Sequence, residues 1–263
     1  APFVRRFVTF DFFHYMSPSR GDAAAALYDA YRRKCVEAEF LPHLGRSMQV
    51  DPTFSYYRDR SPESIADEIR AAGYSVVHYV VVNDADVDQK LVEAFRRRGI
   101  GVWYETFTNG VYRTAGLPDG WESWRMVLRS DLAAQPYNDG FTRLCLNNPG
   151  YRAWKKAAMA RVLRAHKFVG VDLAEPHWPE YPGTTSPVYA CFCRSCREAF
   201  LKAYPEAPGL PDVLDPNSPR HPSRNPDLWN KWLRFRQASL TDFLNDLVNG
   251  PGGLRETCPG RLV

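Results

Sequence analysis

Residues 75–82 read Ser-Val-Val-His-Tyr-Val-Val-Val, and this nearly continuous apolar run decides the fold that the sequence predicts. A strand that is apolar on both faces is typical of a parallel sheet covered by helices. A helical pattern follows over about 86–98, then Gly99, then a second apolar strand over 100–107. Strand, helix and strand in this order predict a right-handed βαβ unit.

The same alternation continues on both sides of this unit. Ser61-Pro62-Glu63 supplies an N-cap, a first-turn proline and an acidic first turn, and Gly73 ends the helix that they open. We expect a strand over 52–57 before that helix. Further along, the pattern predicts a helix over 150–166 and a strand over 168–173.

The two ends of the chain add further elements. Residues 4–14 resemble a strand, and the Ala-rich stretch 21–38 predicts a helix with a buried stripe. A proline-rich loop over 205–226 precedes a long amphipathic helix, whose apolar residues between 228 and 247 recur at helical spacing and predict a core face. Residues 261–263 are expected to open another strand.

Repeated βα units with long polar loops after the strands favour a (β/α)8 TIM barrel over a doubly wound sheet. We count four or five such units, and a barrel needs eight. The predicted fold is therefore an α/β domain that forms roughly the first half of a barrel, a single partial domain over 1–263. Within it, 1–50 form an N-terminal strand and helix unit, and 51–263 form the first βα units with a metal-binding loop over 145–196.

Bulk composition narrows the class of protein. Hydrophobic residues make up 44% of the 263 residues, which argues for a packed core and against disorder. The net charge is only +4, and the runs at 32–34 and 96–98 fit solvated helix surfaces, so we expect no nucleic-acid partner. We find no apolar run that could span a bilayer, hence no membrane partner is expected. A homo-oligomer is compatible with the sequence.

Cysteine usage points to a reducing compartment. Six cysteines at uneven spacing are too few for a disulfide scaffold of this size. The first residues, Ala1-Pro2, lead into two arginines and contain no apolar core of a signal peptide. We therefore expect a cytoplasmic protein, although a signal peptide removed earlier is compatible with the sequence.

Three cysteines in the segment 191–196, Cys-Phe-Cys-Arg-Ser-Cys, form a C-x-C-x2-C cluster typical of a zinc site. A fourth ligand is needed: Cys145, in the loop after a strand, is the best candidate, and Cys258 is a weaker one. Four thiolates would close the coordination sphere, so this zinc would be structural. The alternative is a group of reduced thiols without metal. Cys35, on an apolar helix face, is expected to be a buried thiol.

One carboxylate stands out as a catalytic candidate. Glu175 follows the strand that ends in Asp172-Leu173-Ala174, at the edge where barrel enzymes assemble their sites. Glycoside hydrolysis needs two carboxylates, one of them protonated. The alternative is that Glu175 pairs with an arginine or caps its loop. Asp172 could hold Glu175 or the substrate, or be a structural carboxylate, and Glu105 is the second carboxylate expected at the same mouth.

Aromatic and amide side chains near the strand ends fit a carbohydrate cleft, in which rings stack on sugars and amides bind hydroxyls. Each signal is weak alone. We predict substrate contacts from Tyr104, Asn109, His177 and Trp178, and weaker ones from His14, Tyr56 and Arg58.

Three blocks together resemble a known family. Arg-Leu-Cys-Leu-Asn-Asn-Pro-Gly-Tyr-Arg at 143–152, Asp-Leu-Ala-Glu at 172–175 and Cys-Phe-Cys-Arg-Ser-Cys-Arg-Glu-Ala-Phe at 191–200 follow the order found in family 42 β-galactosidases. They are also similar to blocks of related clan A (β/α)8 glycosidases. The resemblance covers roughly 60–250.

The resemblance implies roles for individual residues. It implies that Cys145 joins Cys191, Cys193 and Cys196 to bind zinc, and that Glu175 is the general acid/base. The family has asparagine where this chain has Ala174. Its nucleophile is a glutamate near the end of the seventh strand, which this chain does not reach, so the chain alone is not expected to turn over substrate.

Three hypotheses on function remain open at this stage. The first is a glycoside hydrolase-like protein that acts on an unknown glycoside by carboxylate acid/base catalysis and carries a structural zinc. The second is a catalytically degenerate carbohydrate-binding or scaffold protein with a TIM-barrel fold, which Ala174 favours. The third, a hydrolase that uses zinc for its chemistry, would need an open coordination position.

Overall fold

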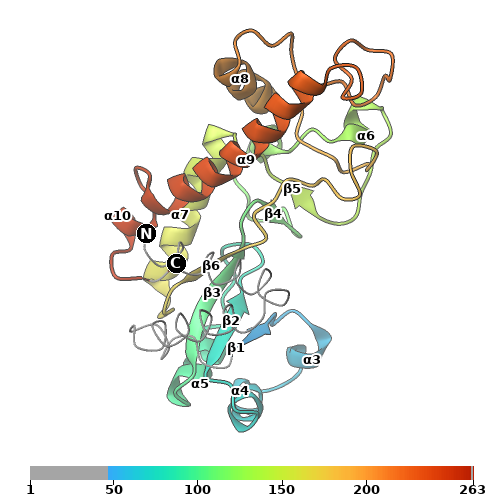
Figure 1. Ribbon diagram of the computed structural model, residues 1–263. Coiled ribbons are helices and arrows are strands. Elements are labelled where there is room, and N and C mark those ends of the chain that lie inside the picture. The colour runs from blue at the N-terminus through green and yellow to red at the C-terminus, as the bar shows by residue number, and fades with distance from the viewer. Residues whose placement is uncertain (1–46, 262) are drawn as a thin grey trace, which may run out of the picture.

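The protein is seen in a computed structural model that describes residues 47–261 and 263, and its centre is a four-stranded parallel sheet in the order β1-β2-β3-β6 (Figure 1). The strands are β1 Ser47–Val50, β2 Val76–Val80, β3 Gly101–Phe107 and β6 Val171–Ala174. Three helices connect them in turn: α4 Pro62–Ala71, α5 Gln89–Arg97 and α7 Pro149–Ala165. The architecture is thus a mixed α/β fold built from successive βα units.

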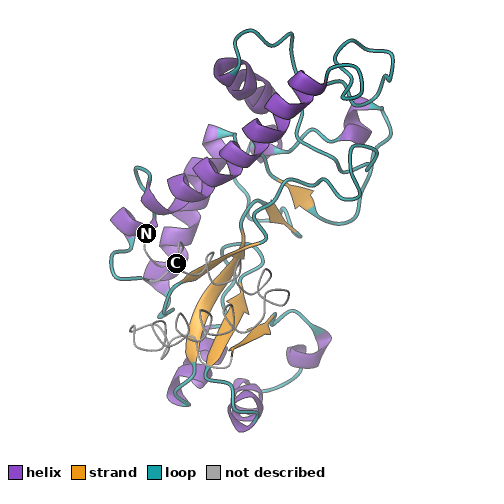
Figure 2. Cartoon of the chain, viewed as in Figure 1, coloured by secondary structure: helices purple, strands orange, loops and turns teal. Residues whose placement is uncertain are grey.

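The remaining elements extend this framework. They are the short helices α3 Ser55–Arg58, η2 Trp121–Trp124, α6 Arg129–Leu132 and α10 Leu254–Thr257, the two-stranded antiparallel sheet of β4 Gly110–Val111 and β5 Thr142–Arg143, and the helices α8 Arg194–Ala203 and α9 Pro226–Asn249. Figure 2 shows the parallel sheet in one half of the molecule, while α9 runs past α7 toward the loops and α8 in the other half. The long loop after β6 therefore lies against α9.

The residues that were expected to begin α4 and to end α4 and α5 do so. The Ser61 side chain accepts a hydrogen bond from the Ser64 amide (3.2 Å), and Pro62 occupies the first turn of α4. Gly73 and Gly99 follow α4 and α5 with φ of 82° and 69°, a conformation that favours glycine. The predictions of these two helices and of the strands after them are confirmed.

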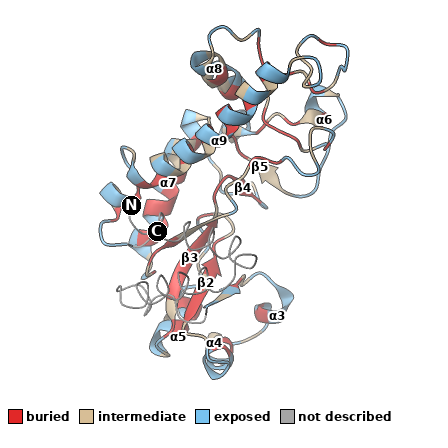
Figure 3. Cartoon of the chain, viewed as in Figure 1, coloured by how far each residue is buried: buried red, intermediate tan, exposed pale blue. Residues whose placement is uncertain are grey.

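One face of the sheet forms the hydrophobic core. Val77 pairs in register with Val102, and Tyr79 pairs with Tyr104, which pairs with Val171. All five residues are buried, and they share one apolar core with side chains of α5 and α7. Figure 3 shows β2 and β3 as buried. Since side chains alternate along a strand, the intervening residues lie on the opposite face.

A buried ion pair fastens α7 beneath the sheet. Lys155 Nζ donates to Asp84 Oδ2 (2.6 Å), to Thr106 Oγ1 (2.7 Å) and to the Phe107 carbonyl (2.7 Å). The Lys155 and Asp84 side chains are only 1% and 2% exposed. The hydroxyls of Tyr104 and Thr106 donate to the other oxygen of Asp84. A buried charge pair with its hydrogen bonds satisfied fixes the position of the helix against β3.

Some local predictions were wrong. Residues 52–57 form a turn and α3 instead of a strand, because Asp51 accepts hydrogen bonds from the Thr53 amide and hydroxyl (2.8 and 2.7 Å) and reverses the chain. The strand lies earlier, at Ser47–Val50, and pairs with β2. Helix α8 was not predicted. In addition, Arg261 and Val263 belong to no strand.

The expected strand at 4–14 and helix at 21–38 lie outside the described residues. The parallel sheet agrees with the predicted α/β class. Because the sheet of the described residues has four strands and a barrel needs eight, closure into a barrel stays a prediction.

The amphipathic helix and the arginine run near α5 were predicted correctly. Trp232 and Phe235 of α9 pack with Phe200 of α8 in a second apolar cluster. The arginines 96–98 form surface ion pairs with Glu93, Glu63 and Asp67. Among the helices described, none has the length and apolar character needed to cross a membrane.

Candidate functional site

The face of the sheet opposite the helices carries a cluster of polar side chains. His78 Nδ1 lies 2.8 Å from Asp172 Oδ2, and the Gln49 side-chain amide donates to Glu105 Oε1. Nitrogen and oxygen atoms of His78, Glu105 and Asp172 all lie within 4.8 Å of one another. We call these four residues, Gln49, His78, Glu105 and Asp172, the polar cluster.

Strand register explains why these residues meet. Glu105 of β3 pairs with Asp172 of β6, and Gln49 of β1 pairs with His78 of β2. Each strand thus contributes one member to the same face, near the carboxyl ends of β3 and β6. Parallel strands of a barrel or a doubly wound sheet assemble their functional groups at this edge.

Burial and charge change the titration of the polar cluster. Burial raises the pKa of Glu105, and the negative charges of Asp172 and Glu175 raise it further. The hydrogen bond from Gln49 and the charge of His78 lower it. The hydrogen bond to Asp172 raises the pKa of His78 against the effect of burial. The pKa values of Glu105 and His78 are thus both raised, and a cluster of carboxyl and imidazole groups with shifted pKa values is typical of functional sites.

Glu175 stands where the sequence predicted it, directly after the last residue of β6. Its backbone has a φ of +49°, the left-handed region that a non-glycine residue rarely adopts. The side chain is exposed, and its charge acts on Glu105. Backbone strain of this kind clusters at functional sites, where the surrounding structure holds it.

Tyr104 does not join the polar cluster. It is fully buried on the helix-covered face, where its hydroxyl donates to Asp84. Because neighbours on a strand point to opposite faces, Tyr104 cannot share a face with Glu105. The structure therefore contradicts the expected contact between Tyr104 and substrate at this face.

The other predicted contacts lie in the loop after β6. The Asn109 amide donates to the His177 carbonyl (2.8 Å) and accepts from the His177 amide (3.1 Å), so it joins the loops after β3 and β6. His177 Nδ1 is 2.7 Å from the Glu175 carbonyl oxygen. Trp178 is buried and donates to the Arg236 carbonyl (2.8 Å). These contacts hold the loop of Glu175 in place.

The weaker candidates lie away from the polar cluster or outside the described residues. Tyr56 and Arg58 belong to α3, where Tyr56 donates to Glu68 (2.5 Å) and Arg58 donates to the Thr53 carbonyl (3.0 Å). His14 and Cys35 lie outside the described residues.

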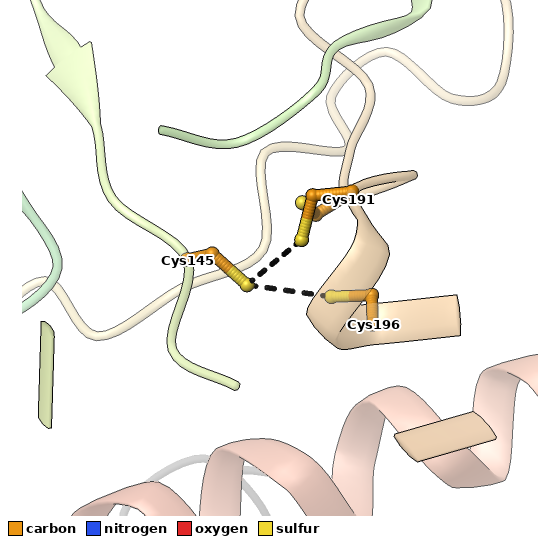
Figure 4. A group of neighbouring side chains, drawn as sticks. Cys145, Cys191 and Cys196 are labelled. Carbon is orange, nitrogen blue, oxygen red and sulfur yellow. Dashed lines mark hydrogen bonds between the residues drawn. The ribbon is translucent and has the colours of Figure 1, made fainter. Parts of the chain in front are cut away.

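The structure brings four cysteines together. Cys145 Sγ lies 3.4 Å from Cys193 Sγ and 3.5 Å from Cys196 Sγ, and all four sulfurs, including that of Cys191, lie within 4.8 Å of one another. Figure 4 shows Cys145 pointing across from its own loop toward Cys191 and Cys196. Cys258 is also buried but contacts the Ala160 carbonyl (3.8 Å) and is not in this group.

The cysteine cluster fits a tetrahedral ion. Thiolates bound to zinc at about 2.3 Å would stand about 3.8 Å apart, close to the spacing of these sulfurs. Hydrogen bonds from Cys145 and its neighbours lower the pKa of Cys193, whereas burial raises the pKa of Cys191. A thiolate is therefore favoured within the cluster, and metal coordination requires thiolates. Zinc itself stays a prediction.

The sequence-based reasoning missed Gln49 and His78 as members of the polar cluster. His78 is the one histidine inside the apolar run 75–82, so its polarity was a signal that the residue faces something other than the core. Gln49 lies in a strand that the pattern did not reveal. Its neighbours Ser47 and Val50 show too short an alternation to predict a strand.

Comparison with known proteins gives only distant matches. No family model matches the sequence, and no curated protein matches it. The β-galactosidase from the psychrophilic Marinomonas ef1 is similar in structure with a TM-score of 0.49 and 15% identity, over 82% of this chain and 36% of that chain. The α-L-fucosidase isoenzyme 2 from Paenibacillus thiaminolyticus gives 0.43 and 14%, over 78% and 31%.

The α-galactosidase TtGalA from Thermus thermophilus, in complex with stachyose, gives a TM-score of 0.38 and 17% identity, over 53% of this chain and 34% of that chain. The chain thus spans about a third of the length of the solved structures that it resembles.

Proposed function

We propose that the chain forms the first part of a glycoside hydrolase barrel in which Glu175 is the general acid/base. The observation that carries this proposal is the place of Glu175, an exposed carboxylate in a strained backbone conformation at the carboxyl end of a parallel strand. Its charge also raises the pKa of the buried Glu105. The sequence resemblance to family 42 β-galactosidases supports the same assignment.

The residues of the candidate site would have separate roles in this reaction. Glu175 would protonate the glycosidic oxygen as the bond breaks. Glu105 would donate a hydrogen bond to a sugar hydroxyl while protonated, and the His78–Asp172 pair would hold a second hydroxyl from the floor of the site. Asn109 and His177 would keep the Glu175 loop in position. We assign the nucleophile or base to a part of the protein outside this chain, as the resemblance implies.

We propose that zinc occupies the cysteine cluster as a structural ion. Cys145, Cys191, Cys193 and Cys196 would hold it, and four sulfur ligands leave no position for substrate. The ion would supply cross-linking between the loop that follows β5 and the segment that opens α8.

The test uses the complete protein and a panel of nitrophenyl glycosides. Glu175→Gln should lower kcat by about 10²–10⁴-fold on substrates with poor leaving groups, the usual contribution of a general acid, and by less on dinitrophenyl glycosides, whose leaving group needs no proton. The exposed Glu122 offers a matched control, and Glu122→Gln should keep full activity. Equal activity of Glu175→Gln and the wild type would contradict the proposal.

A carbohydrate-binding protein without catalysis is the second candidate. The observation that favours it is Ala174, whose side chain offers no hydrogen bond at the position before Glu175. Binding of oligosaccharides by the complete protein, with no hydrolysis of any glycoside in the panel, would select this function over the first.

A further inference from the structure

Three aromatic side chains gather at the carboxyl end of β3. The ring of Phe107 lies 5.2 Å from that of Tyr112 and 5.8 Å from that of Phe141, and the Tyr112 and Phe141 rings are 4.9 Å apart. All three pairs meet edge to face, the geometry that aromatic pairs prefer. We call these residues the aromatic cluster.

The aromatic cluster remains accessible although its rings contact one another. Tyr112 is 56% exposed, and Phe107 and Phe141 are half-buried. Most large apolar side chains of the described residues are buried, so three rings that share an open surface indicate a binding surface.

Neighbouring groups restrict the position of the Phe141 ring. A Cβ at Gly110 would lie 2.2 Å from the Phe141 ring, so in this position the ring packs directly on the glycine of β4. The Arg143 guanidinium lies 5.4 Å from the centre of the Phe141 ring, and Asp139 holds it with two hydrogen bonds (3.1 and 2.7 Å). A pre-organised surface loses less entropy when it binds.

The aromatic cluster is continuous with the candidate catalytic site. Phe107 pairs in register with Ala174, the residue before Glu175, and shares a strand face with Glu105. The next residue, Thr108, donates to the Ala174 carbonyl from both its amide (2.9 Å) and its hydroxyl (2.7 Å). The segment that runs from β3 through β4 to Tyr112 is therefore fastened to the end of β6, which Glu175 follows.

We propose that the aromatic cluster binds a sugar ring of a saccharide with two or more units, next to the unit whose glycosidic bond reaches Glu175. The assignment rests on the proposed function. Aromatic rings present flat apolar faces at low cost in conformational entropy, and a sugar ring has an apolar face of matching size. Because the aromatic cluster is continuous with the strand ends that carry Glu105 and Glu175, a sugar fits this surface better than a protein partner does.

Calorimetric titration of the complete protein in the Glu175→Gln background separates binding from hydrolysis. The probes are β-1,4-galactotriose, cellotriose and xylotriose, each compared with its monosaccharide. At least one trisaccharide should bind more tightly than its monosaccharide. Tyr112→Ala should weaken that binding about 10-fold and leave monosaccharide binding unchanged, the loss expected for one stacked aromatic ring. Tyr112→Phe should restore the affinity, because it keeps the ring.

Tyr137→Ala is the matched control, since Tyr137 is also an exposed tyrosine (45%) but lies outside the aromatic cluster. It should bind every probe as the wild type does. Equal affinity for trisaccharide and monosaccharide, or undiminished affinity in Tyr112→Ala, overturns the proposal. So does a loss of thermal stability or of self-association in Tyr112→Ala without a change in saccharide binding, which would assign the rings to packing.

The proposal and the proposed function fail separately. If trisaccharide binding depends on Tyr112 but the protein hydrolyses no glycoside, the aromatic cluster is a sugar-binding site and the proposed hydrolase activity is wrong. If hydrolysis depends on Glu175 but Tyr112→Ala leaves trisaccharide affinity unchanged, the hydrolase proposal stands and the sugar-binding role of the aromatic cluster is wrong.

Discussion

His78 Nδ1 lies 2.8 Å from Asp172 Oδ2, although the two residues are 94 positions apart and their strands are separated by β3. Strands two places apart are about 10 Å from each other, so these side chains meet readily only where the sheet curls toward their face. A sheet that curls toward its polar face is what closure into a barrel requires. The contact therefore indicates that the four described strands curve toward the polar cluster and defines the floor of the candidate site, while closure into a barrel stays a prediction.

The first prediction concerns the titration of His78. Its pKa should lie above 6.5 in the wild type, because Asp172 stabilises the charged ring. Asp172→Asn should lower it, since burial then acts without the compensating carboxylate. The pH dependence of the imidazole NMR signals measures both values. His166, whose pKa is lowered by burial, is an internal control that should not respond to the substitution.

The same pair predicts how stability depends on pH. A histidine whose pKa is raised in the folded state adds stability that is fully present below about 6.5 and is lost as pH rises through the raised value. The free energy of unfolding of the wild type should fall across this window, and that of Asp172→Asn should fall less. Parallel urea unfolding curves for both proteins across the window would contradict the pairing.

Ionisation of Glu105 should lower the free energy of unfolding. Burial raises its pKa, so the stability that it contributes is present below about 4.5 and is lost as pH rises through the raised value. Glu105→Gln removes the charge and keeps an oxygen to accept from Gln49. The variant should therefore melt at a higher temperature than the wild type at pH 8 and at a similar temperature at pH 4.

Glu122→Gln, at an exposed position, should change the melting temperature at neither pH. A Glu105→Gln variant that is less stable than the wild type at pH 8 would show that the folded protein favours the ionised carboxylate at this position.

The cysteine cluster predicts a bound metal. Elemental analysis of the purified protein should find about one zinc ion per chain, and Cys145→Ser should lose most of it, because the serine hydroxyl is a poor ligand for zinc. Cys258→Ser is the matched control, since Cys258 is buried outside the cluster and should leave the zinc content unchanged. Wild-type protein free of metal and fully reactive toward thiol reagents would favour four reduced thiols.

The ion pair beneath the sheet should be important for folding. Lys155→Ala leaves Asp84 buried without its partner, and the loss of one member of such a pair costs about 3–5 kcal/mol. Urea unfolding should show this loss. Asp84→Asn removes the unpaired charge, so the double variant should recover part of the stability. A double variant whose loss equals the sum of the two single losses would show that the residues do not interact.

Local sequence features determined the secondary structure around the sheet. The apolar runs of β2 and β3, the cap at Ser61 and the glycines after α4 and α5 act over a few residues, so their outcome depends little on the rest of the chain. The strand expected at 52–57 failed because a side-chain hydrogen bond from Asp51 competes with an extended chain.

The candidate site was predictable only in part. Cysteine spacing and the Asn-Pro turn after Cys145 pointed to the four residues that the structure brings together. The alternation of Tyr104 and Glu105 was also available from the sequence, and applied strictly it would have placed Tyr104 on the helix side.

The sequence by itself determined the order of helices and strands from α4 to β3 and the residues that begin α4 and follow α4 and α5, because periodicity and caps are local. Only the tertiary structure decided that Gln49, His78, Glu105 and Asp172 share one face. It also decided that Phe107, whose ring contacts Tyr112, pairs in register with Ala174, the residue before Glu175. Strand order and register bring residues more than fifty positions apart within a few ångströms, and no local pattern carries that information.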